Sequence, residues 1–206
     1  VSVEGQHGVD SGTGAEAILA VRLRYGDEGG HTRRALAAFT EQEVAARIVA
    51  AYFVENPADR GSARMPRQHL LLDPEELIQD TAAANFVEVF LAKEGHDNPV
   101  GINLLTKIQL PVLASLYGAM LAGVDVVIMG AGIPREVPAI LDGLAGHNDV
   151  SMALQVEGAT AQDDFRAHLS PRSVLCSALR ELRRPIFYPI VSSNVLALTM
   201  ARKASG

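Results

Sequence analysis

Several ingredients of common protein classes are scarce or missing in this sequence. It contains a single cysteine, Cys176, and no tryptophan. One cysteine excludes an internal disulfide and a zinc site built from several thiolates. No apolar run approaches the roughly 20 residues that a membrane-spanning helix needs, and the first residues lack the pattern of a signal peptide. We therefore expect a cytoplasmic protein with no membrane partner.

Positive charge is also in short supply. The formal net charge is −6 and the pI is about 5.5, whereas domains that bind nucleic acid usually present a basic face. The local basic cluster consists of Arg180, Arg183 and Arg184. It falls late in a segment with helical periodicity, where cations stabilise a helix C-terminus. We expect no nucleic-acid partner.

The residues that are present favour a globular α/β protein. With 206 residues, of which 48% are hydrophobic, the chain can build one sizeable core, and we expect one domain over residues 1–206. Short apolar runs alternate with helix-like segments, which is typical of a parallel sheet. The runs predict strands at about 7–10, 99–105, 125–129 and 186–192, with a weaker one at 152–156. A doubly wound sheet and a (β/α)8 barrel both give this pattern, and both hold ligands at the carboxyl ends of the strands.

One long connection between predicted elements is irregular. Residues 55–72 contain two prolines, a glycine and mixed charges, which predict a surface excursion without regular structure. Asp73 followed by Pro74 predicts the start of the next helix, because aspartate is a favoured N-cap and proline a favoured first residue.

The clearest predicted strand is followed by Gly130-Ala131-Gly132, which resembles the start of the dinucleotide fingerprint G-x-G-x-x-G. Arg135 occupies the third glycine position and would obstruct the close helix–strand packing found there. Pro134 removes a backbone N–H where a phosphate would bind. These two residues exclude the fingerprint. An ordinary turn, or a loop whose backbone approaches a flat ligand, both remain open.

Three polar residues are candidates at the strand ends. Asn103 lies inside an apolar strand, where its amide must bond either to a neighbouring loop or to a ligand. Ser192 and Ser193 come directly after the apolar run PIFYPIV of the last predicted strand. An N-cap explains at least one of them, and a flavin or phosphate contact is the alternative. The histidines show no metal-ligand spacing, and we interpret His31 and His96 as surface residues. We expect no metal site.

Three longer segments carry a family resemblance. They are NFVEVFLAKEGHDNPVGINLLTKIQLP, LYGAMLAGVDVVIMGAGIPREVPAILDGL and PIFYPIVSSNVLALTMARKASG. They resemble the nitronate monooxygenase family, formerly called 2-nitropropane dioxygenases, in the subgroup near the flavin enoyl reductases of polyunsaturated fatty acid and polyketide synthesis. The resemblance implies a (β/α)8 barrel that binds FMN at the carboxyl ends of its strands. It also implies oxidation of alkyl nitronates with molecular oxygen, or flavin-mediated reduction in the enoyl reductase branch.

The resemblance implies roles for particular residues and a small-molecule substrate. GINLL would be the third-strand motif of the family, with Asn103 near the flavin. MGAGIP would be the fourth-strand loop, so that Gly130, Ala131 and Gly132 line the flavin and substrate pocket. Ser192 or Ser193, at the end of the fifth strand, would face the same pocket.

The resemblance also implies that parts of the family barrel have no counterpart in this chain. These parts are the first strand, the segment with the catalytic histidine and the later loops that hold the FMN phosphate. We therefore assign no catalytic residue, and we expect a partial barrel, about strands 2–5 with their helices, that binds FMN weakly on its own. Its exposed strand edges would permit self-association. The alternatives are a non-catalytic α/β fragment and a trans-acting flavin enoyl reductase of lipid or polyketide synthesis.

Overall fold

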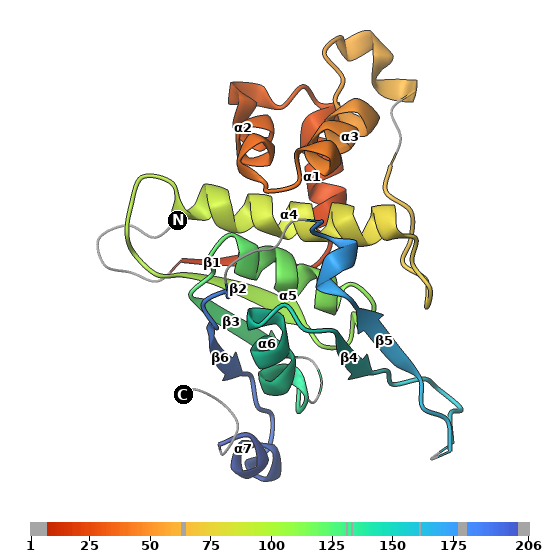
Figure 1. Cartoon of the computed structure of the whole chain (residues 1–206), viewed down its shortest axis with the longest axis vertical. Helices are drawn as coiled ribbons and strands as arrows, with labels where there is room; N and C mark the ends of the chain where they lie inside the picture. The colour runs from red at the N-terminus through yellow and green to blue at the C-terminus, as the bar shows by residue number, and fades with distance from the viewer. Residues whose placement is uncertain are drawn as a thin grey trace.

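The computed structural model describes residues 8–62, 65–130, 132, 134–160, 162–176 and 181–201 (Figure 1). At its centre is a parallel four-stranded sheet in the order β1-β2-β3-β6. The strands are β1 (Gly8–Ser11), β2 (Val100–Leu105), β3 (Val126–Gly130) and β6 (Ile186–Pro189). Each begins within one residue of its predicted position, and the α/β prediction is confirmed.

Helices fill the connections between the parallel strands. In the described ranges the helices are α1 (Ala15–Arg24), α2 (His31–Ala38), α3 (Gln42–Tyr52), α4 (Glu75–Lys93), α5 (Val112–Leu121), α6 (Val137–Ala145) and α7 (Asn194–Met200). Three short 3-10 turns accompany them: η1 (Glu28–Gly30), η2 (Pro57–Ser62) and η3 (Pro171–Ser173). Residues 65–74 form neither helix nor strand.

Helix α4 organises the core, since it contacts α1, α2, α3, α5 and the sheet. Residues 80–89 of α4 are all buried, as expected for a helix covered on every side. The tightest approach is to α5 at Gly118, where an added Cβ would lie 1.9 Å from the carbonyl oxygen of Ala82. Glycine at this position therefore sets the separation of the two central helices.

The two faces of the sheet differ in burial. Alternate residues of a strand point to opposite faces. Ile102, Val127 and Phe187 share one row, and all three are fully buried against the helices. The rows on either side point the other way, and we call their residues the open face: Val9, Ser11, Gly101, Asn103, Leu105, Val126, Ile128, Gly130, Ile186 and Tyr188. Val9 is 45% exposed and Tyr188 is 42% exposed, so this face is partly uncovered.

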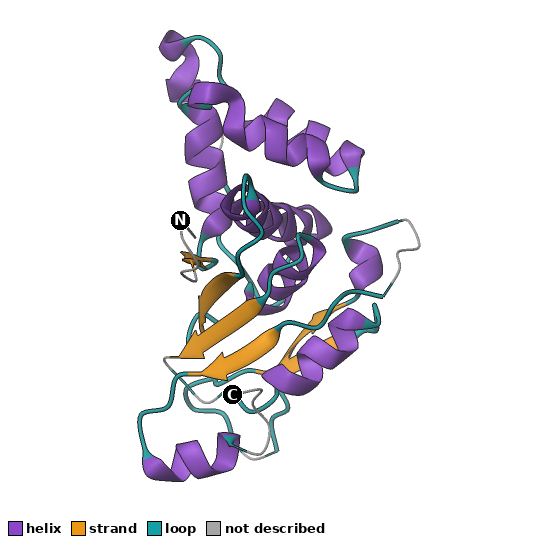
Figure 2. Ribbon diagram, turned by 90° about the vertical axis from the view of Figure 1, so that its left-hand side faces the viewer, coloured by secondary structure: helices purple, strands orange, loops and turns teal. Residues whose placement is uncertain are grey.

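The strand order explains why one face is uncovered. The strands follow one another across the sheet in chain order, and α4 and α5 pack against them (Figure 2). Crossovers between parallel strands are almost always right-handed, so such an order places the connecting helices on one side of the sheet. Parallel sheets are normally covered on both faces. The open face is therefore the side of this sheet that lacks its usual cover.

A second, two-stranded sheet was not expected. It pairs β4 (Val150–Ala153) with β5 (Arg166–Leu169) in antiparallel register. The weaker strand predicted at 152–156 overlaps β4, but it does not join the parallel sheet. Ala167 and Leu169 are buried, and β5 contacts α5. These two residues alternate with the polar Arg166 and His168. An alternation of only four residues is too short to identify a strand from sequence.

The segment before β6 whose periodicity predicted a helix, with Arg183 and Arg184 near its end, is not an α-helix in the described residues. Residues 171–173 form a single 3-10 turn and residues 181–185 are not helical, while Arg180 lies outside the described residues. Arg183 Nη1 lies 3.0 Å from Asp125 Oδ1, and Arg184 pairs with Asp142. Carboxylates from other segments, rather than a helix C-terminus, therefore neutralise these arginines.

Candidate functional site

The predicted site residues lie at or near the carboxyl ends of the parallel strands. The Thr106 N–H donates a 2.8 Å hydrogen bond to the carbonyl of Gly130, which joins the loop after β2 to the end of β3. The Leu105 N–H donates to Thr13 Oγ1 at 3.2 Å, which joins the end of β2 to the loop after β1. This edge of the sheet is thus held together by bonds between successive loops.

Asn103 lies on the open face, in a row with Ser11, Ile128 and Tyr188. Its Oδ1 is shielded from solvent, and no donor from the described residues reaches it. A buried polar atom left without a hydrogen bond costs roughly 1–3 kcal/mol. No described loop therefore satisfies this oxygen.

The glycines after β3 have an explanation within the chain. An added Cβ at Gly130 would lie 2.9 Å from Ile190 Cβ, and one at Gly132 would lie 2.8 Å from Thr106 Cβ. Ala131, between them, lies outside the described residues. The close approach that requires glycine is therefore made by neighbouring side chains, and the glycines alone do not indicate a ligand.

The two serines lie beyond the end of β6. Ser193 is the N-cap of α7, where its Oγ accepts the N–H of Leu196 at 3.2 Å, so the predicted cap is confirmed. Ser192 is exposed in the preceding loop. Because β6 ends at Pro189, neither serine belongs to a row of the sheet.

Sequence reasoning missed a histidine cluster near the carboxyl end of β1. His69 Nδ1 lies 2.5 Å from Asp73 Oδ2, and its Nε2 lies 3.7 Å from Glu16 Oε1 in the first turn of α1. Asp73 is therefore not the predicted helix cap: α4 begins after Pro74, and Asp73 instead accepts the Leu70 N–H and holds His69. Glu16 is so distant in sequence that no local spacing could reveal the cluster.

The surroundings of His69 determine its charge. Burial disfavours the imidazolium, but the carboxylates of Glu16 and Asp73 outweigh burial and raise the pKa of His69. Thr81 Oγ1 is 3.4 Å from Nε2, yet Thr81 is fully buried and bonds to the Leu77 carbonyl at 2.8 Å. A raised pKa favours the protonated imidazole, which cannot accept a further proton. The cluster therefore fastens residues 65–74 to α1 and α4.

His69→Gln is expected to remove a stabilising contribution that depends on pH. Because the folded-state pKa is raised, the contribution is fully present below the ordinary value of 6.5 and is lost as pH rises through the folded-state pKa. We expect a loss of about 2 kcal/mol at pH 6, typical of charged hydrogen bonds, and a smaller loss at pH 9. Urea unfolding at both pH values measures this, with the exposed His168→Gln as control. An equal loss at the two pH values would contradict it.

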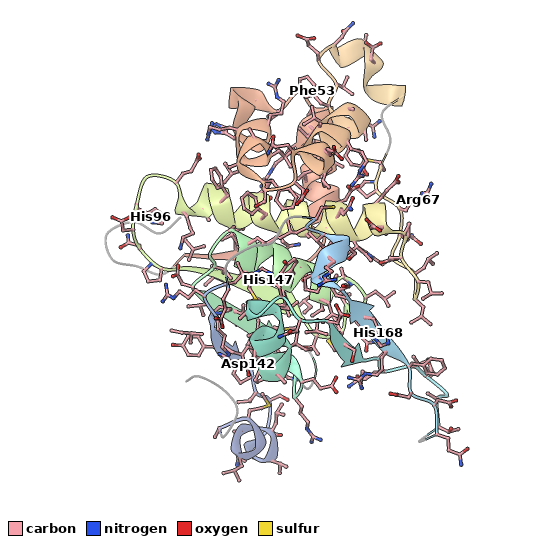
Figure 3. All side chains as sticks on the ribbon, in the orientation of Figure 1. Phe53, Arg67, His96, Asp142, His147 and His168 are labelled. Atoms are coloured by element: carbon pink, nitrogen blue, oxygen red, sulfur yellow. The ribbon has the colours of Figure 1, made fainter. Side chains whose placement is uncertain are left out.

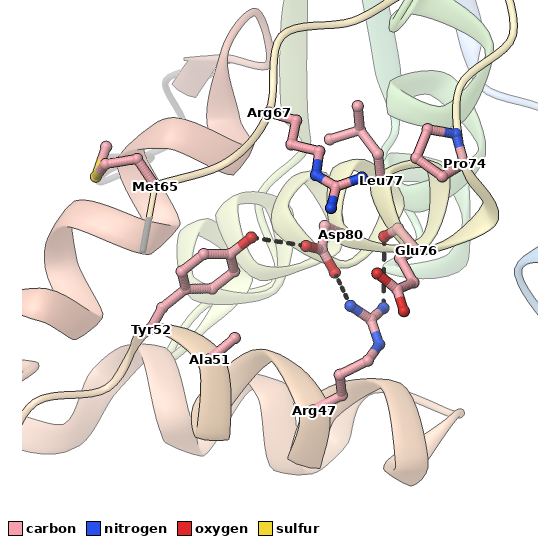
Figure 4. Close-up of a pocket in the computed structure, with 9 residues that line it drawn as sticks. All are labelled: Arg47, Ala51, Tyr52, Met65, Arg67, Pro74, Glu76, Leu77 and Asp80. Carbon is pink, nitrogen blue, oxygen red and sulfur yellow. Dashed lines mark hydrogen bonds and ion pairs between the residues drawn. The ribbon is translucent and has the colours of Figure 1, made fainter. Parts of the chain in front are cut away.

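A second polar cluster connects α3 to α4 (Figure 4). Arg47 Nη1 lies 2.8 Å from Asp80 Oδ1, and the Tyr52 hydroxyl donates to Asp80 Oδ2 at 3.0 Å. Burial raises the pKa of Asp80, although Arg47 and Tyr52 offset part of the effect. The adjoining cavity of about 160 Å³ is small for an organic ligand. The cluster is best explained as a structural ion pair.

Other histidines do not converge on a site. His96, His147 and His168 lie in three separate parts of the structure (Figure 3). His147 Nδ1 hydrogen-bonds to the hydroxyl of Tyr117 at 2.8 Å, and burial raises the pKa of Tyr117 to about 12. Within the described ranges, no group of three or more histidine, cysteine or acidic residues could hold a metal ion.

No protein-family model, curated protein or solved structure matches the chain. In the part of the chain that the structure describes, each helix is too short or too polar to cross a bilayer.

Proposed function

We propose that the chain forms part of an FMN-dependent oxidoreductase barrel of the nitronate monooxygenase type. Parallel strands in sequential order with helices on one side are the arrangement of neighbouring strands in a (β/α)8 barrel, in which the other face lines the interior. The open face would then be part of the inner wall. The observation that carries the proposal is Asn103 Oδ1, a buried acceptor on that face without a donor among the described residues.

The residues around Asn103 fit one part of a flavin. A side-chain amide can both accept from a ring N–H and donate to a ring carbonyl. Leu105, Ile128 and Tyr188, on the same face, offer apolar and aromatic surface to a planar ring. FMN would supply the electron transfer, and these side chains would bind and orient it. The substrate in this proposal is a small molecule, an alkyl nitronate, that is oxidised with molecular oxygen.

A closed barrel of this type has eight strands, and the described sheet has four. The outer strands, β1 and β6, each have one edge that no other described strand pairs with. Such edges accept further strands. We propose that a second copy of the chain supplies these strands by self-association. Sedimentation velocity over a range of concentrations should show a dimer, and a monomer at every concentration would contradict this part of the proposal.

Asn103→Leu is expected to weaken FMN binding by about tenfold, the effect of losing roughly 1.4 kcal/mol of hydrogen bonding. Titration of the purified chain, followed by flavin fluorescence, measures the affinity. Asn148→Leu is a matched control, because Asn148 is exposed in the loop between α6 and β4. Equal affinities of Asn103→Leu and the unmodified chain would remove the main support for the proposal.

A non-catalytic α/β module is the second candidate. It is favoured by the absence, among the described residues of the open face, of any histidine or carboxylate that could move a proton. A flavin enoyl reductase is the third. Oxygen uptake with propyl nitronate and NADPH oxidation with an enoyl thioester separate the two enzymes, and a chain without FMN affinity supports the module.

A further inference from the structure

A cavity of about 320 Å³ lies between the loops that follow β2 and β3, the start of α6 and the end of β4. Val137 and Met152, both buried, contribute apolar surface to it. Lys107 and Arg135 also line it, and both side chains are exposed. The cavity is therefore amphipathic, with an apolar wall and a cationic rim.

The charge that remains available in the cavity is positive. Neither Lys107 nor Arg135 forms an ion pair with a described carboxylate. The acidic residue of the lining, Glu136, is already engaged: its Oε2 accepts the Ala153 N–H at 2.7 Å, and its Oε1 lies 3.1 Å from Arg166 Nη2. Burial acts against ionisation, but these donors outweigh it and lower the pKa of Glu136. Two cations are thus left for an anionic ligand.

Other groups shape and polarise the same cavity. Thr106 lines it, and the Oγ1 of this residue is buried without a hydrogen-bond partner among the described residues. Gln109 is used structurally, since its Nε2 donates to the Gln155 carbonyl at 3.0 Å and its Oε1 accepts the Gln155 N–H. These two bonds join the loop after β2 to the segment after β4, both of which line the cavity. The N-terminus of α6 also opens here, and its dipole favours negative charge.

We propose that this cavity binds a small molecule with an oxyanion head and a short apolar body, such as a short-chain carboxylic acid. The head lies between Lys107 and Arg135, and the body covers Val137 and Met152. A neutral ligand would gain nothing from the two cations, and a simple inorganic anion would leave the apolar wall in contact with water. None of these four residues belongs to the open face, although Gly132, which the resemblance assigns to the flavin and substrate pocket, also lines this cavity.

Titration with sodium hexanoate, followed by amide NMR signals of the ¹⁵N-labelled chain, tests the proposal. The amide signals of Val137, Met152 and Leu154 should shift. Acetate and inorganic phosphate should bind more weakly than hexanoate, and hexanol should bind at least about fivefold more weakly because it lacks the charge. Hexanol or phosphate binding as tightly as hexanoate, or shifts confined to other parts of the chain, would overturn it.

Variants at the rim separate a specific site from general attraction. Lys107→Gln and Arg135→Gln should each weaken hexanoate binding by about fivefold. Arg172→Gln is the control, because Arg172 is an exposed arginine of η3 that does not line the cavity. Unchanged affinity in both rim variants, or an equal loss in the control, would overturn the assignment of the head group to these two residues.

Discussion

Gly118→Ala is expected to destabilise the folded chain by about 3 kcal/mol or more, at the upper end of what overpacking causes. The added Cβ would lie 1.9 Å from the Ala82 carbonyl oxygen, and the next nearest atoms also belong to the backbone of α4. No change of side-chain rotamer can relieve such a contact, so α4 and α5 must move apart. Alanine favours a helix over glycine by roughly 1 kcal/mol, and the expected loss of stability already includes this gain.

Urea unfolding followed by circular dichroism measures this loss. Gly61→Ala is the matched control, because an added Cβ there meets nothing within 4 Å. It should change the free energy of unfolding by less than about 1 kcal/mol. If the free energy of unfolding of Gly118→Ala equalled that of the control, α4 and α5 could not lie as close together as described.

Arg47→Met is expected to cost about 3 kcal/mol at pH 7, the lower end for a buried ion pair that loses one partner, because Arg47 is itself 31% exposed. The variant leaves the Asp80 carboxylate, only 7% exposed, with the Tyr52 hydroxyl as its remaining described partner. Methionine keeps much of the aliphatic volume, so the measurement reports chiefly the lost charge.

The cost of Arg47→Met should depend on pH in a stated direction. The pKa of Asp80 is already raised, so protonation of Asp80 stabilises the folded state. This stabilisation is fully present below the ordinary pKa of 3.8 and is lost as pH rises through the folded-state pKa. Removing Arg47 raises that pKa further. The two proteins should therefore differ little near pH 4 and most at pH 7, where adding Asp80→Asn should restore stability. Arg24→Met, at the end of α1, is the control, and an effect of Arg47→Met that is independent of pH would refute the explanation.

The parallel strands could be predicted because they leave a local signal. β2 and β3 are apolar runs bounded by polar loops, and their burial agrees with that pattern. β5 could not be predicted, since its RAHL sequence becomes a strand through pairing with β4. The helix expected before β6 failed for a related reason: long-range ion pairs hold Arg183 and Arg184, and local periodicity does not reveal such partners.

The candidate site divides in the same way. Asn103 stood out because an amide inside an apolar strand is unusual in any fold, and its unpartnered oxygen agrees with that signal. Gly130 and Gly132 do lie where a side chain would clash, as the pattern indicated. The groups that would clash include Ile190 and Thr106, whose positions beside these glycines the sequence does not reveal. The His69 cluster could not be predicted, because Glu16 reaches it only after α1 and residues 65–74 have packed together.

The most direct test of the central claim, that the open face is the inner wall of a flavin barrel, is an FMN titration of the ¹⁵N-labelled chain followed by amide NMR signals. This measurement detects weak binding and locates it. We expect shifts at Asn103, Leu105 and Ile128 and at their neighbours on β2 and β3, with the signals of α2 unchanged. Shifts absent from the open face, or located instead among the helices that cover the other face, would contradict it.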